Sequence, residues 1–196
     1  MTDFGGTPEL SGGASGGRVP PLERITAQAE RISLLCDLLE AIADSLPSPE
    51  AGACEEAAQI CRAEVHRHYE DVNTVLIPAL RSRVRDNPDR ARLLARIEED
   101  LHEDATRLAE LIDILGIYGA GRESPLNAEA FGYALRGFFE TIRRQLSWEA
   151  EVLVPMADQV LEDGDLDIMA QRLASRDSCG PCPNAGKCGC RVTFLN

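Results

Sequence analysis

The sequence is poor in histidine, in aromatic residues and in basic charge. Among its 196 residues only three are His, and aromatic residues make up 5%. There are 33 acidic residues against 20 Lys and Arg, which gives a formal net charge of −13. A protein that binds nucleic acid needs a basic face for the phosphate backbone, so this balance argues against nucleic-acid binding.

Long apolar runs are also missing. No stretch approaches the roughly 20 apolar residues that cross a bilayer, so no membrane span is predicted. The N-terminus has no basic start followed by an apolar core, as a secretory signal would, and a cytoplasmic location is expected. The seven cysteines are then expected to be thiols or metal ligands and not structural disulfides. Because neither a nucleophile–base set nor a phosphate-binding loop is found, we do not expect an enzyme.

No segment alternates polar and apolar residues with the period of a strand. Apolar residues instead recur every three or four positions, which predicts amphipathic helices. We predict four long helices, over about residues 21–46, 50–84, 88–119 and 125–161, and a short fifth from Asp165 to about residue 174, after a break at Gly164. The short connections favour an all-α, antiparallel up-down four-helix bundle over residues 21–175. The Gly-rich residues 1–20 are predicted to be a disordered tail, and residues 176–196 a Cys-rich tail.

One eleven-residue segment occurs twice, at His68–Pro78 and at Gln145–Pro155. V-L-I-P-A at 75–79 matches V-L-V-P-M at 152–156. Ten positions before the proline stand His68 in the first copy and Gln145 in the second, and six positions before it stand Val72 and Glu149. These positions lie on the apolar faces of the second and fourth helices. A polar side chain there needs a partner, since burying it unpaired is costly.

In an antiparallel bundle, His68, His102, Gln145 and Glu149 are expected to converge at one height. Imidazole and carboxylate groups suit iron, zinc or manganese, and two His with one carboxylate form a recurrent iron site. The alternative is a buried hydrogen-bond network without metal, in which Glu149 accepts from a histidine and Gln145 completes the network.

Three segments carry a family resemblance: L-L-C-D-L-L-E-A-I-A-D at 34–44, the two proline-ended repeats, and L-H-E-D at 101–104. Over about residues 22–175 the chain resembles the hemerythrin-like, HHE cation-binding domains. The resemblance implies a four-helix bundle with a non-haem di-iron centre. In the version it resembles, the first and third helices each give a His, and the second and fourth each give H-x-x-x-E before the proline.

Carried onto this sequence, the resemblance implies a depleted set of ligands. His68, His102 and Glu149 occupy ligand positions, whereas Val72 replaces a Glu and Gln145 replaces a His. The first-helix position falls near Ala29, which offers no ligand. These three remaining ligands can hold a single metal ion, with iron as the first candidate, completed by Gln145 or water. The alternative is loss of the metal altogether, with the bundle kept for another purpose.

The C-terminal tail contains four cysteines within twelve residues: Cys179, Cys182, Cys188 and Cys190. Thiolates at such spacing can hold zinc or an iron–sulfur cluster, and free thiols or disulfides are the alternative. Of the other cysteines, Cys36 and Cys61 lie on apolar faces and are predicted to be buried. Cys54, near a helix start, is predicted to be exposed.

Three functional hypotheses follow. The first is a hemerythrin-like protein that binds a metal ion in a depleted site and serves in sensing, storage or redox handling. The second is a metal-free helical module that acts through a protein partner, with the cysteine tail as its zinc or iron–sulfur element. The third, against which the missing ligands count, is a di-iron oxygen-binding or cluster-repair protein.

Overall fold

The computed structural model describes residues 19–122 and 126–178, and all regular structure within these ranges is helical. The tail cysteines Cys179, Cys182, Cys188 and Cys190 lie outside the described residues. The elements are α1 (Pro21–Asp44), α2 (Ala51–Ile60), α3 (His66–Asp71), α4 (Ile77–Arg83), α5 (Pro88–Gly119), α6 (Ala128–Trp148), α7 (Val154–Val160) and α8 (Asp163–Ser178), with three π-helical turns, η1 (Cys61–Val65), η2 (Val72–Leu76) and η3 (Glu149–Leu153).

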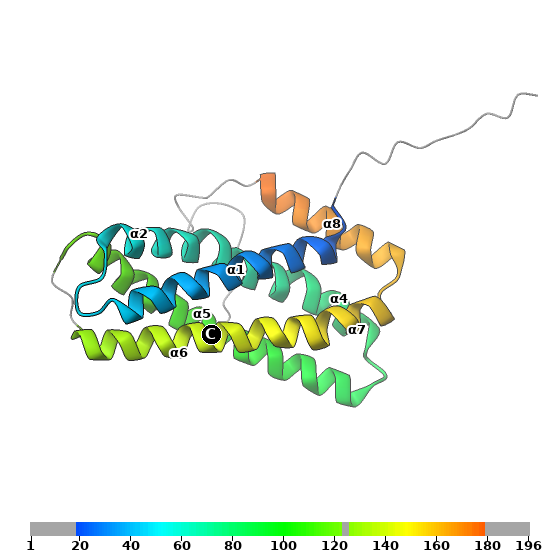
Figure 1. Ribbon diagram of the computed structural model, residues 1–196. Coiled ribbons are helices and arrows are strands. Elements are labelled where there is room, and N and C mark those ends of the chain that lie inside the picture. Colours follow the sequence, from blue (N-terminus) through cyan, green and yellow to red (C-terminus); the bar gives the residue numbers. More distant parts are fainter. Residues whose placement is uncertain (1–18, 123–125, 179–196) are drawn as a thin grey trace, which may run out of the picture.

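These elements form four long rods that run antiparallel to their chain neighbours (Figure 1). The rods are α1, the run from α2 to α4, α5, and the run from α6 to α7. Helix α8 crosses back over the end of the bundle where α1 begins. The predicted all-α bundle with a short fifth helix is confirmed.

Asparagine side chains cap the third and fourth rods. The side-chain oxygen of Asn87 accepts from the backbone N–H of Arg90 at 3.0 Å, and that of Asn127 accepts from Ala130 at 2.8 Å. Each bond satisfies one of the N–H groups that a helix start leaves without a partner. The predicted break at Gly164 is wrong by a few residues, because Gly164 lies within α8 and the chain leaves the helix at Leu161.

The two repeats share a backbone feature that periodicity does not reveal. In each copy a π-helical turn begins six residues before the proline, at Val72 and at Glu149. The backbone N–H of Ile77 bonds to the Val72 carbonyl, and that of Val154 bonds to the Glu149 carbonyl, five residues back. Pro78 and Pro155 then stand at the start of a fresh α-helix, where a missing N–H costs little.

The core runs the length of the bundle and includes three cysteines. Phe131 is fully buried and stacks on Tyr118, with ring centroids 4.4 Å apart. Cys36 and Cys61 are buried as predicted, but the prediction for Cys54 is wrong because its side chain is fully buried too. Cys54 lies on the face of α2 that also buries Ala57 and Ala58, so it belongs to the core despite its place near the helix start.

Burial should make these core thiols unreactive in the folded protein. Removal from water raises the pKa of Cys61 to about 12 and that of Cys36 to about 11, which leaves little reactive thiolate near neutral pH. In a full-length variant with the four tail cysteines changed to serine, we expect almost no reaction with a thiol-specific dye until denaturant is added, when three thiols per chain should react. Rapid labelling of the native variant would contradict this packing.

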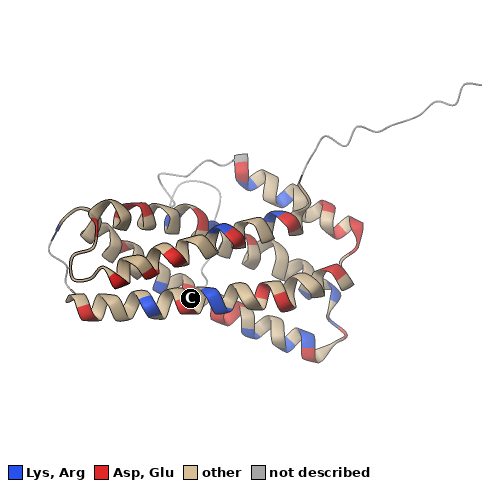
Figure 2. Ribbon diagram, in the orientation of Figure 1, with Lys and Arg blue, Asp and Glu red and all other residues tan. Residues whose placement is uncertain are grey.

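Charged residues are spread along all the helices, with acidic residues in the majority (Figure 2). Some link neighbouring rods, as where Arg143 of α6 pairs with Asp37 and Glu40 of α1 at 3.0 and 2.7 Å. Exposed pairs of this kind contribute little to stability individually. None of the described helices combines the length and apolarity that a membrane span requires.

Candidate metal centre

The centre of the bundle holds a buried pair, His68 and Glu149. His68 on α3 is completely buried, and Glu149, the first residue of η3, is 3% exposed. The imidazole Nε2 lies 2.8 Å from the carboxylate Oε2, so the ring donates to the carboxylate. The two repeats therefore meet inside the bundle, each contributing the one ligand-type residue that it retains.

Two glutamines flank this pair. Gln145, one helical turn before Glu149, donates its amide to the second carboxylate oxygen, Oε1, at 3.1 Å. The other nitrogen of His68, Nδ1, lies 3.4 Å from the side-chain oxygen of Gln28 on α1. Both imidazole nitrogens thus face oxygen atoms of neighbouring side chains.

From Gln28 the network continues to a second buried carboxylate. Asp71 has no exposed surface, and its Oδ2 accepts from the Gln28 amide at 3.0 Å. Arg176 of α8 lies 2.9 Å from Oδ1 of Asp71, and Arg24 of α1 lies 3.8 Å from Oδ2. Burying this carboxylate would be costly without such partners. The short fifth helix, α8, therefore supplies the positive charge of Arg176 opposite the buried Asp71.

The structure brings together three of the four predicted bundle residues: His68, Gln145 and Glu149. The expected convergence does not extend to His102, because its side chain is exposed on α5 while Leu101 and Asp104 are buried. Successive residues on an α-helix point about 100° apart. A displacement of one position from the apolar stripe is therefore enough to turn a side chain outward.

Sequence reasoning missed three buried polar residues: Gln28, Asp71 and Asp104. Gln28 could have been found, because it lies three residues after Ile25 and four before Ile32 on the buried stripe of α1. It, and not Ala29, is the α1 residue that contacts His68. Asp104 carries a pKa raised mainly by burial, against the opposing effect of Arg107, which donates to it at 3.0 Å.

Two buried oxygen atoms at the centre have no hydrogen-bond partner within the described part of the chain. They are the side-chain oxygen of Gln145 and the hydroxyl of Tyr69. Burial, together with the negative charges of Asp104 and Glu149, raises the pKa of Tyr69 well above its usual value, which keeps this hydroxyl protonated. Unpaired buried oxygens are uncommon and mark a place where a further donor or a cation can be accommodated.

Comparison with known protein families agrees with this arrangement. The model for the hemerythrin HHE cation-binding domain matches residues 21–157. This chain belongs to the hemerythrin family. The match spans all four rods and ends just after Pro155, so it includes both repeats. No curated protein matches the chain, and no solved structure does.

Domains of this family bind cations, typically iron. The residues at the centre of the bundle decide which metal content suits this chain. Two irons do not fit this hemerythrin domain. Among the described residues, His68 and Glu149 are the ligand-type pair in contact at its centre, and the buried Asp71 and Asp104 are paired with Arg176 and Arg107. Among the described residues, no three His, Cys, Asp or Glu are grouped so as to hold a metal ion. A single cation fits the donor chemistry better, since the partnerless oxygen of Gln145 adds a third donor beside an imidazole nitrogen and a carboxylate.

Proposed function

We propose that this hemerythrin domain binds one divalent cation, iron in the first instance, through His68 and Glu149. The supporting observation is the fully buried imidazole–carboxylate pair, which lies where the two proline-ended repeats meet. Gln145 supplies the third protein donor through its partnerless side-chain oxygen. Iron in such a site would contribute one-electron redox chemistry and open positions for small ligands.

The chain's own residues favour holding such an ion over turning over an organic substrate. His68 and Glu149 are enclosed, and Gln145 is the only one of the three that is partly exposed. The direct contact between His68 and Glu149 means that a cation must compete with an existing hydrogen bond. We therefore propose reversible binding of modest affinity, which suits sensing, storage or redox handling in the cytoplasm.

A metal-free role is the second candidate, and the hydrogen-bond pattern favours it. Both His68 nitrogens already face acceptors, at 2.8 and 3.4 Å, and the carboxylate of Glu149 has a partner at each oxygen. In that case the network stabilises the bundle, and the domain acts through a protein partner. Zinc or an iron–sulfur cluster would then be bound by Cys179, Cys182, Cys188 and Cys190 of the tail.

Metal analysis of the full-length protein, purified without chelator and reloaded with ferrous iron, distinguishes the two candidates. We expect about one iron per chain in the wild type and in the variant with all four tail cysteines changed to serine. The variants His68→Ala and Glu149→Ala should lose it. His102→Ala should retain it because this side chain is exposed.

Two results would contradict the bundle site. Iron or zinc that disappears with the tail cysteines alone, and is unchanged by His68→Ala, would assign the metal to the tail. The absence of bound metal in every variant, after reloading, would favour the metal-free module. If His102→Ala loses the metal as His68→Ala and Glu149→Ala do, the result would support the three-ligand site that the sequence predicted.

A further inference from the structure

A second polar site lies beside the centre, at the surface between α1, α3 and α8. It is a pocket of about 520 Å³ lined by residues of these helices, of η1 and of the segment before α1. Three arginines line it, Arg24, Arg31 and Arg67, together with the two acids Glu64 and Asp177. A surplus of basic groups in one pocket is unexpected in a chain of net charge −13.

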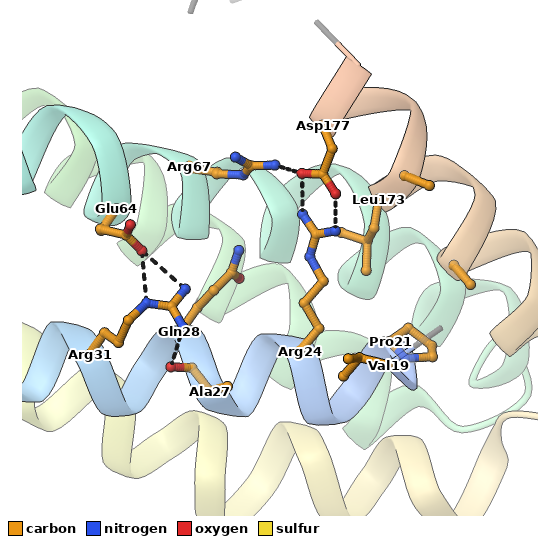
Figure 3. Close-up of a pocket in the computed structure, with 12 residues that line it drawn as sticks. Val19, Pro21, Arg24, Ala27, Gln28, Arg31, Glu64, Arg67, Leu173 and Asp177 are labelled. Atoms are coloured by element: carbon orange, nitrogen blue, oxygen red, sulfur yellow. Dashed lines mark hydrogen bonds and ion pairs between the residues drawn. The ribbon is translucent and has the colours of Figure 1, made fainter. Parts of the chain in front are cut away.

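Two of these arginines share one carboxylate (Figure 3). The two terminal nitrogens of Arg24 donate to the two oxygens of Asp177, at 2.5 and 2.9 Å. Arg67 pairs with the same carboxylate. Arg31, by contrast, already has its own partner in Glu64, at 3.1 Å. Two-pronged guanidinium–carboxylate contact is the geometry by which proteins recognise carboxylate ligands.

Asp177 is an unusual residue to find at its position in α8. It lies in the last turn of the helix, where the helix dipole disfavours negative charge. Its side chain is about half exposed, at 48%. The two arginines, and not the helix, therefore hold the carboxylate in place, and a competing carboxylate from solution can reach them.

Releasing Asp177 would not detach α8 from the bundle. Arg176, its neighbour, pairs independently with the buried Asp71 at 2.9 Å and with Glu70. Met169 and Leu173 of the same helix are 1% exposed and packed in the core. The pocket can therefore open at Asp177 while the helix remains docked.

We propose that this pocket binds a small organic acid, a carboxylate on a short apolar chain, and that Asp177 occupies the carboxylate position in its absence. Arg24 and Arg67 bind the carboxylate group. The apolar part contacts the small and aliphatic side chains that make up the rest of the lining, which include Ala27, Ala170, Leu173 and Ala174. This site uses none of the ligands of the proposed cation site.

Gln28 connects the pocket to the centre of the bundle. It lines the pocket, and its side chain also contacts His68 and Asp71. Arg24 approaches Asp71 as well, at 3.8 Å. A ligand that draws Arg24 towards the pocket will therefore change the surroundings of Gln28, and through Gln28 those of the His68 ring.

The test is calorimetric titration of the full-length protein with hexanoate, with acetate and inorganic phosphate as comparison probes. Asp177→Asn removes the competing carboxylate, so we expect it to bind hexanoate about tenfold more tightly than the wild type. Arg24→Gln and Arg67→Gln, placed in the Asp177→Asn background, should each abolish binding. Acetate should bind more weakly than hexanoate because it lacks the apolar chain.

A matched control is Asp44→Asn, which frees Arg136 from a similar ion pair, at 3.0 Å, elsewhere on the surface. It should not change hexanoate binding. Histidine ring NMR signals give a second readout, and we expect hexanoate to shift the signal of His68 but not that of His102. Equal hexanoate affinity in Asp177→Asn and wild type, or phosphate binding as tight as hexanoate binding, would overturn the proposal.

Discussion

Replacing Glu149 with alanine should lower the free energy of unfolding of the metal-free protein by about 1–3 kcal/mol, the usual cost of leaving a buried hydrogen-bonding group without its partner. The loss is large because His68 is completely buried and would keep a donor without an acceptor at 2.8 Å. Gln145 would lose its acceptor as well. Denaturant unfolding in the presence of a chelator measures this change directly.

Glu151→Ala is the matched control, since Glu151 belongs to the same π-helical turn but is exposed. It should change the free energy of unfolding by no more than about 0.5 kcal/mol. Combining Glu149→Ala with His68→Ala should cost clearly less than the sum of the two single changes, because the double variant leaves neither member of this pair buried without the other. If Glu149→Ala behaves like Glu151→Ala, the contact between His68 and Glu149 is not part of the folded protein in solution.

Restoring the ligand-type residue that each repeat lacks should make the stability of the folded protein depend on iron. The variant carries Val72→Glu and Gln145→His, so that each repeat regains both ligand-type residues. Val72 is completely buried, and a carboxylate there without a cation should cost about 3 kcal/mol or more. Ferrous iron should reverse the loss, because a ligand at 100 times its dissociation constant adds about 2.7 kcal/mol to the stability of the folded state.

The measurement is thermal unfolding followed by circular dichroism, with chelator and with ferrous iron. Val75→Glu is the control, since Val75 is 1% exposed in the same turn but not at a ligand position of the repeat. It should be destabilised to a similar extent, and iron should not rescue it. Rescue of both variants by iron, or of neither, would show that the repeats do not surround a common cation position.

Much of the site could be inferred from the sequence because the two prolines fix the register of the repeats. Counting back from Pro78 and Pro155 identifies His68 and Glu149, and the structure places these residues in contact. Counting does not identify Gln28, which belongs to no repeat, or Asp71, which lies in the first repeat opposite Trp148 of the second. Both are recognised only by their burial. Nor does it show that His102 is exposed, because its distance from the apolar stripe of α5 is a single residue.

By itself, the sequence determined the helices and their order, since the spacing of apolar residues and the capping asparagines act within a few residues of one another. It also pointed to the family, because each of the two repeats is a continuous stretch of eleven residues. Only the tertiary structure decided which polar atoms meet. The rotation of each helix sets whether a side chain faces the centre, and the docking of α8 supplies Arg176 to Asp71 and Asp177 to Arg24. These contacts join residues more than 100 positions apart, beyond the reach of any local pattern.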